Sequence, residues 1–187
     1  CISVSVGSGT SANGRKLSIL GGRSTGRTGG QVALGSGEGT ATSSGMILIR
    51  SVNAGDAGSS GTLCFSSGSA STGNSGEMVL ASGASSNGRG GGLYVAIGSG
   101  TSGAGGLVAF ASGRSTAVTG GLVKVTTGEG TASSSGSVTL MSTNSGAGGS
   151  SGSLIFRSGT YKAGNSGEVR LGSGASSAGR GGSVSVV

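Results

Sequence analysis

The chain has 187 residues, of which 46 are glycine, and it contains no proline, histidine or tryptophan. Ordinary globular proteins contain about 7% glycine and glycine disfavours helices, so this composition excludes a conventional mixed domain with long helices, while the lack of proline excludes collagen and polyproline architectures. The net charge of +7 comes from only 9% charged residues spread along the chain, which predicts a solvated surface and no nucleic-acid interface.

No apolar run approaches the roughly 18 residues that a membrane-spanning helix requires, so we expect no membrane insertion. No signal or transit peptide is visible. The first residue is Cys1 rather than methionine, and we expect a processed chain or a piece of a longer one.

A motif of two apolar residues separated by one variable residue recurs along the chain. The first apolar position recurs every 15 residues, with a step of 16 after the fourth and the tenth motifs. It is occupied by Ile2, Leu17, Val32, Ile47, Leu63, Met78, Leu93, Val108, Val123, Val138, Leu154, Val169 and Val184, and a second apolar residue always follows two positions later. Because residues two apart share one face of a strand, each repeat is predicted to open with a short, half-buried strand.

The remainder of each repeat is small and polar. Glycine normally stands two residues before the first apolar position, and it stands five residues after that position in 10 of 12 repeats, as at Gly37, Gly83 and Gly128. Such rows indicate either turns with positive φ or backbones too close for a Cβ atom. A row of Thr and Ser eight residues after the first apolar position is compatible with a second, more polar strand; its members are Thr10, Thr25, Thr40, Ser71, Ser86, Thr101, Thr116, Thr131 and Ser177.

The order of the 15- and 16-residue spacings between motifs itself repeats after 91 residues. Residues 1–91 and 92–182 form two copies that match at about half of their positions, mostly in the turns, and 183–187 begin a third. Stacked repeats can bury a core that one repeat cannot. We therefore predict an all-β parallel β-solenoid, a single rod over residues 1–187 with about 12 coils of 15–16 residues, stacked ~4.8 Å apart.

The stacking register predicts which charged residues and cysteines lie close together. Arg23 and Glu38, and likewise Arg114 and Glu129, occupy one coil position in consecutive coils, and each pair is predicted to mark the register as an exposed ion pair. Cys1 lies four coils from Cys64, too far for a disulfide between them. Free thiols or a bond to another chain remain the alternatives.

Two sets of residues are candidates for assembly. Full apolar motifs stand at both ends of the sequence, and open edge strands there are predicted to pair with another chain; these residues are Ile2, Val4, Val184 and Val186. The residue between the two apolar positions is apolar in four consecutive coils, which predicts either an exposed lateral contact or a second buried layer; these residues are Leu48, Cys64, Val79 and Tyr94.

Catalysis and cofactor binding are not indicated. Without histidine a serine nucleophile lacks its usual base, and the five acidic residues and two cysteines form no metal-ligand cluster in the sequence. We expect no enzyme, no cofactor and no metal site.

The segment Gly76-Glu77-Met78-Val79-Leu80-Ala81-Ser82-Gly83-Ala84-Ser85-Ser86 resembles the Gly/Ser-rich arrays of large surface proteins of algae and other heterokonts, some of which are similar to components of flagellar hairs and extracellular fibres. Val95-Ala96-Ile97-Gly98-Ser99-Gly100-Thr101 resembles the head repeats of bacterial trimeric adhesins. The short repeats and Thr rows are similar to insect ice-binding proteins.

The sequence thus predicts a structural subunit or stalk segment of an extracellular or cell-surface fibre. Its partners would be copies of itself or adjoining repeats of a longer chain, and the many Ser and Thr residues leave glycans as a further class. The alternative is a binding module, either an adhesin shaft or head or an ice-binding protein.

Overall fold

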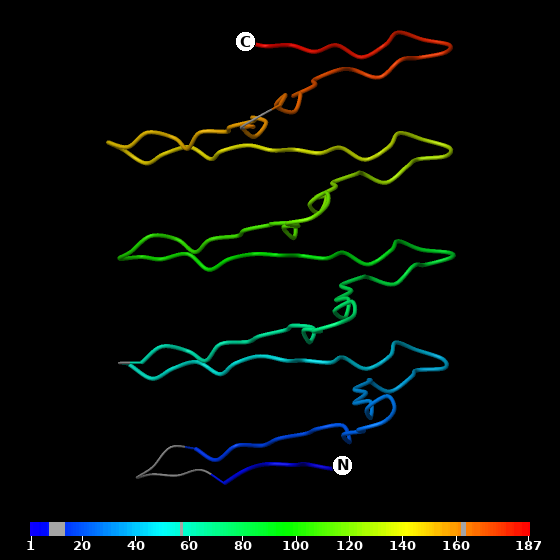
Figure 1. Cartoon of the computed structure of the whole chain (residues 1–187), viewed down its shortest axis with the longest axis vertical. Coiled ribbons are helices and arrows are strands. Elements are labelled where there is room, and N and C mark those ends of the chain that lie inside the picture. The colour runs from blue at the N-terminus through cyan, green and yellow to red at the C-terminus, as the bar shows by residue number, and fades with distance from the viewer. Residues whose placement is uncertain (8–13, 57, 162–163) are drawn as a thin grey trace. The chain divides into compact units, whose positions relative to one another are not determined.

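The structure, a computed structural model, describes residues 1–7, 14–56, 58–161 and 164–187. Over these residues the chain contains neither a helix nor a strand, and the backbone is a succession of extended stretches and bends (Figure 1). The predicted parallel β-solenoid is therefore wrong, as are the strand predicted at the start of each repeat and the end strands predicted at Ile2–Val4 and Val184–Val186. Thr10 of the Ser/Thr row lies outside the described residues.

The chain divides into two units, Cys1–Tyr94 and Val95–Val187. The division lies close to residue 91, where the first copy of the super-repeat ends in the sequence. Each unit thus corresponds nearly to one copy of six repeats.

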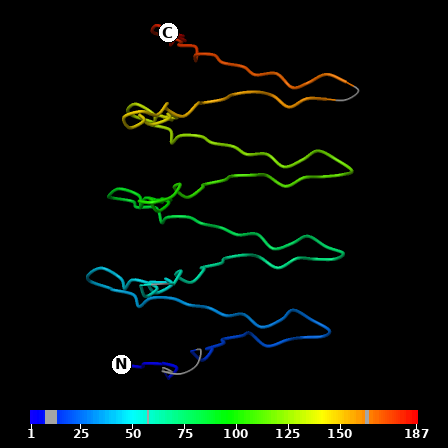
Figure 2. The ribbon, with the colours of Figure 1, turned by 90° about the vertical axis from the view of Figure 1, so that its left-hand side faces the viewer.

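The 15-residue period survives in the structure as a period of bends. Within each unit the backbone repeatedly runs outward to a tip and returns (Figures 1 and 2). The bends of the 15-residue repeats begin at Thr25, Thr40, Ser71 and Ser86 in the first unit, and at Thr101, Thr116, Thr131 and Ser177 in the second. The Ser/Thr row, which is compatible with a polar strand in the sequence, therefore marks bends in these repeats instead.

The backbone hydrogen bonds explain why no solenoid forms. A parallel stack needs bonds between equivalent residues of successive repeats, which lie 15 residues apart in this sequence. In the described part of the chain, the backbone bonds outside regular elements join residues eight or three apart, always within one repeat. Each of these bonds therefore closes one repeat on itself, and none of them holds neighbouring repeats in a ladder.

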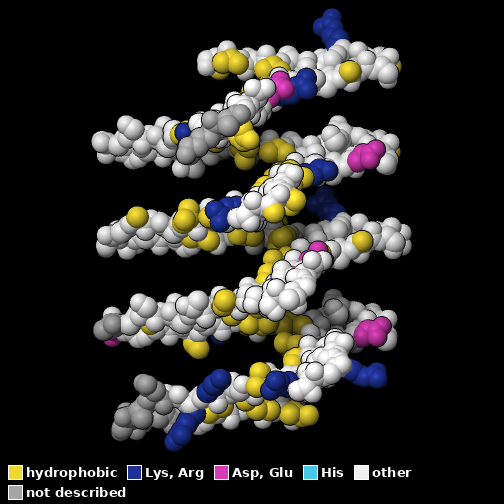
Figure 3. Space-filling model, viewed as in Figure 1, with side chains coloured by type: hydrophobic (Ala, Val, Ile, Leu, Met, Phe, Trp, Pro, Cys, Tyr) yellow, Lys and Arg dark blue, Asp and Glu magenta, His cyan; other side chains and the backbone are white. Residues whose placement is uncertain are grey.

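No described side chain is buried, whether apolar or polar. The accessible surface is 18608 Å², whereas a folded monomer of 17.1 kDa would expose about 7,700 Å² and its extended chain about 25,000 Å². Hydrophobic side chains consequently lie open along the visible faces of both units (Figure 3). The dry core predicted from the apolar rows is absent among the described residues.

The two apolar rows still differ in their surroundings. Between Leu17 and Val184, side chains at the first apolar position are 45–62% exposed, while those at the second position are 50–79% exposed from Ile19 to Leu171. The first position is thus the more sheltered one in most repeats.

Among the residues described, no helix has the length and apolar character needed to cross a bilayer.

Candidate assembly surface

Loops closed between two glycines are the main local structure of both units. The N–H of a glycine two residues before an apolar motif donates to the C=O of the glycine eight residues earlier. The bonds run from Gly30 to Gly22 at 2.7 Å, Gly45 to Gly37 at 2.9 Å, Gly91 to Gly83 at 3.4 Å, Gly121 to Gly113 at 2.9 Å, Gly136 to Gly128 at 3.0 Å and Gly182 to Gly174 at 3.4 Å. The last three repeat the first three after 91 residues, so the super-repeat is a structural one.

Close approach, rather than positive φ, explains the glycine before several of the apolar motifs. A Cβ atom placed at Gly91 or Gly121 would lie 3.1 Å from the Cβ of Ser82 or Ser112, respectively. The Ser82 hydroxyl also donates to the C=O of Gly91 at 2.8 Å. Among the described residues, only Gly148 has a positive φ, at 88°. Of the two interpretations open from the sequence, the close-packing one holds for these glycines.

Inside the loops, the residue seven positions after the first apolar residue takes one of two forms. In three of the loops where it is serine, its hydroxyl accepts an N–H three residues later, as in Ser24 with Arg27 at 3.0 Å and Ser115 with Val118 at 3.0 Å. Such a side chain-to-backbone bond stabilises a turn. Where it is glycine, as at Gly39, later carbonyl groups of the same loop occupy the space of a Cβ atom.

The two 16-residue repeats close differently. Val52 and Thr143 replace the glycine that opens the eight-residue loop in other repeats. Here the N–H of Gly58 donates to the C=O of Gly55 at 3.4 Å, and Gly149 donates likewise to Gly146 at 3.3 Å. The extra residue thus accompanies a tight turn in place of a wide loop.

The candidate lateral residues are all exposed. Leu48 is 64% exposed, Val79 72% and Tyr94 94%, and Cys64 is an exposed free thiol, as is Cys1. Their counterparts 91 residues later are Thr139, Ile155, Arg170 and Ser185. The first unit therefore carries an apolar row that the second unit retains only at Ile155, which sequence reasoning missed because it considered only runs of consecutive coils.

The end residues are also open to solvent. Ile2 and Val186 are more than nine-tenths exposed, and Val4 and Val184 are more than half exposed. Their role in assembly remains a prediction, but the strands expected to carry it are not present.

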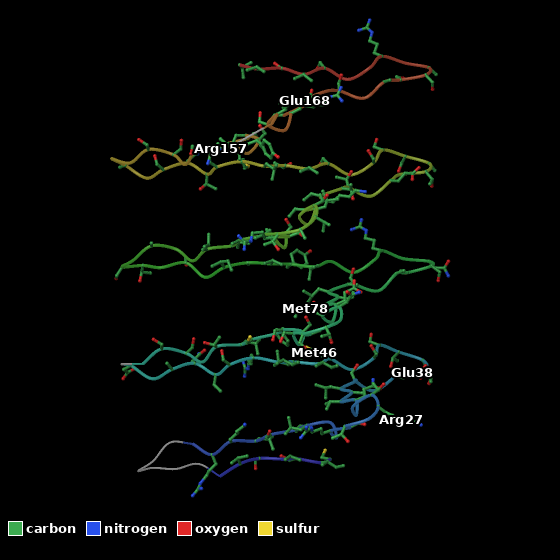
Figure 4. All side chains as sticks on the ribbon, viewed as in Figure 1. Arg27, Glu38, Met46, Met78, Arg157 and Glu168 are labelled. Atoms are coloured by element: carbon green, nitrogen blue, oxygen red, sulfur yellow. The ribbon has the colours of Figure 1, made fainter. Side chains whose placement is uncertain are left out.

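The charged residues do not adopt the predicted pairs. In the described ranges the ion pair formed is Arg170–Glu168, with 3.4 Å between Nε and Oε1. Arg23 with Glu38 and Arg114 with Glu129 are not brought together, because repeats do not stack in register. Arg27 and Glu38 lie on successive loops of the first unit with exposed side chains (Figure 4).

A shallow hollow in the first unit is lined by Arg50, Ser51, Val52 and Asn53. It lies in the 16-residue repeat, directly after the apolar run Met46–Ile49. The described residues contain no cluster of acidic or cysteine side chains that could hold a metal ion. The described surface offers exposed apolar side chains and free backbone groups for contacts.

Comparisons with protein-family models, with curated proteins and with solved structures find no match to this chain.

Proposed function

We propose that this protein is a non-catalytic structural subunit of an extracellular or cell-surface fibre, and that its partner is a second copy of the same chain or of the same repeats. The observation that carries the proposal is the exposure of every large apolar side chain described. Monomers rarely expose more than a few hundred Å² of contiguous apolar surface. Association that covers these rows is favourable because it removes apolar surface from water.

The period favours a copy of the chain as the partner. Apolar groups recur at steps of 15 and 16 residues over the whole sequence. A surface that contacts many of them at once must have the same spacing, and another copy has it by construction. Gly/Ser-rich composition and the resemblance to fibre-forming surface arrays support an extracellular location.

The lateral row provides the first test. Leu48→Asp introduces a charge into the apolar row of the first unit, whereas Ala109→Asp places the same charge at an exposed residue of the second unit that also stands between two apolar positions. We expect wild-type chain and Ala109→Asp to form filaments in electron microscopy and concentration-dependent species in sedimentation velocity. Leu48→Asp should assemble at a concentration severalfold higher, because a charge must be desolvated at the contact.

Filaments that form equally well with both variants would contradict a lateral contact at Leu48. A wild-type chain that remains monomeric at all concentrations would contradict the fibre itself. In that case ice binding and carbohydrate binding would be measured next, since they belong to the alternative binding module.

A further inference from the structure

Two segments of the chain differ from all others in lacking glycine. Residues 46–54 and 137–145 are each nine residues long and lie 91 residues apart, while every other glycine-free stretch has six residues or fewer. They exist because Val52 and Thr143 stand where other repeats have a loop-forming glycine. Glycine weakens extended pairing through its backbone entropy, so these segments are the best suited to pair with another chain.

The backbone of both segments is unpartnered in the described chain. Gly45 and Gly55, which flank the first segment, each form a backbone bond, as do Gly136 and Gly146 around the second. Between these glycines, no backbone bond among the described residues involves 46–54 or 137–145. Exposed rows of free N–H and C=O groups are templates for pairing with a strand of another molecule.

The side chains of the segments favour such pairing. The first reads Met-Ile-Leu-Ile-Arg-Ser-Val-Asn-Ala and the second Ser-Val-Thr-Leu-Met-Ser-Thr-Asn-Ser. Both are rich in β-branched and apolar residues, lack proline and carry at most one charge, which is the composition of segments that pair between chains.

We propose that segment 46–54 of one copy pairs with segment 137–145 of the next copy, an inference that rests on the self-assembly proposed above. The charge at the centre of the first segment disfavours pairing between two copies of 46–54. Arg50 is the fifth of nine residues in 46–54, and Met141 is the fifth of nine in 137–145. If two copies of 46–54 pair side by side over all nine residues, Arg50 faces Arg50 whether the strands are parallel or antiparallel.

Pairing of unlike segments removes this repulsion, because Arg50 then faces Met141 in either orientation. Like charges directly opposite each other on paired strands are destabilising. In the parallel orientation, Ile47 also lies beside Val138 and Ile49 beside Leu140, so the apolar positions match.

The consequence is an open assembly. The contact joins the first unit of one molecule to the second unit of another, and the remaining segment on each molecule stays free for the next one. Such heterologous contacts give filaments when the symmetry does not close. Successive molecules are then displaced by one super-repeat of 91 residues.

A charge substitution at Met141 tests the pairing. We expect Met141→Glu to lower the concentration needed for filament formation roughly twofold to fivefold, because Glu faces Arg50, and Met141→Arg to raise it by a similar factor. Ala109→Glu and Ala109→Arg make the same changes in net charge at an exposed position outside both segments and should have little effect. The measurement is a pelleting assay over a concentration series with the full chain.

Hydrogen exchange of the assembled wild-type chain supplies a second measurement, and amides of both segments should become protected relative to the monomer. If both Met141 variants assemble less well than their Ala109 controls, like segments pair and the inference is wrong. Equal behaviour of the Met141 and Ala109 variants, or unprotected segment amides in filaments, also overturns it. A wild-type chain that forms no filaments refutes the proposed function instead.

Discussion

At the scale of single residues, the glycines of this chain serve different purposes at positions only two apart. A Cβ atom at Gly37 would meet nothing within 4 Å, although its carbonyl closes the loop to Gly45. At Gly39 a Cβ atom would lie 2.8 Å from the carbonyl oxygen of Thr42 and still closer to that of Ser43. Backbone cannot move aside as a flexible side chain can, so Gly39 is required by the loop and Gly37 is not.

The pair Gly39→Ala and Gly37→Ala isolates this difference. We expect Gly39→Ala to open the loop and to speed the exchange of the Gly45 amide severalfold, because the new methyl group overlaps the carbonyl groups of Thr42 and Ser43. Gly37→Ala should leave that exchange unchanged or slow it slightly, since alanine restricts the unfolded chain. Amide exchange measured by NMR on both variants checks the prediction, and equal rates in the two would contradict it.

At the scale of the element, the unit of structure is the closed loop. Its frame is two glycines and one backbone bond, and its interior is braced by a serine hydroxyl in some repeats. In the loop Gly113–Gly121, Ser115 accepts the N–H groups of Ala117 and Val118 at 3.4 and 3.0 Å. The loop carries no buried side chain, so these few bonds are its principal source of order.

Removing the hydroxyl should therefore loosen the loop measurably. We expect Ser115→Ala to destabilise the closed loop by about 0.5–1 kcal/mol, the usual net contribution of one hydrogen bond. Ser115→Thr keeps the acceptor and should retain most of the protection. The readout is the exchange rate of the Val118 amide, and an alanine variant as protected as wild type would refute the role of the hydroxyl.

The sequence predicted the period of the chain but not its secondary structure. Thr40 and Thr131 begin bends although their row is compatible with a strand, whereas Gly45 and Gly136 are packed closely, which is one of the two interpretations that their row allows. The predicted strands do not form because two apolar residues such as Leu63 and Phe65 define only three residues of extended chain. A strand needs a neighbouring strand to bond with, but the glycine N–H and C=O groups that form backbone bonds here do so within their own repeat.

The residues proposed for assembly were only partly predictable from the sequence. The lateral row Leu48–Tyr94 was found because four consecutive coils share it. The nine-residue segments 46–54 and 137–145 were not singled out, although the missing glycines at Val52 and Thr143 were visible signals. Val52 and Thr143 matter because they stand where other repeats have the glycine that closes a loop, and the sequence pattern alone does not show that loop bond.

At the scale of the whole molecule, the isolated chain has buried little of the surface that folding normally removes. Its 18608 Å² leaves roughly one third as much surface to expose on unfolding as a globular protein of this size would have. The sensitivity of stability to denaturant scales with that surface. The single chain and the assembled chain should therefore respond differently to urea.

We expect the dilute monomer to give a broad, weakly cooperative urea transition with an m-value about one third of that of a globular protein of equal length. Its far-UV circular dichroism should lack strong helix and strand bands. Assembled material should unfold more sharply, because association buries the apolar rows. A sharp transition with a full m-value in the dilute monomer would contradict the open structure.

The glycine-to-glycine loops also give a fibre of such chains a way to yield under load. An eight-residue stretch spans up to about 26–29 Å when pulled straight, but a closed loop brings its ends together through one bond, such as that between Gly30 and Gly22. Tension would break that single bond before any covalent link and release the stored length. Each loop that opens dissipates work and can close again when the load is removed, so the thread lengthens stepwise and recovers.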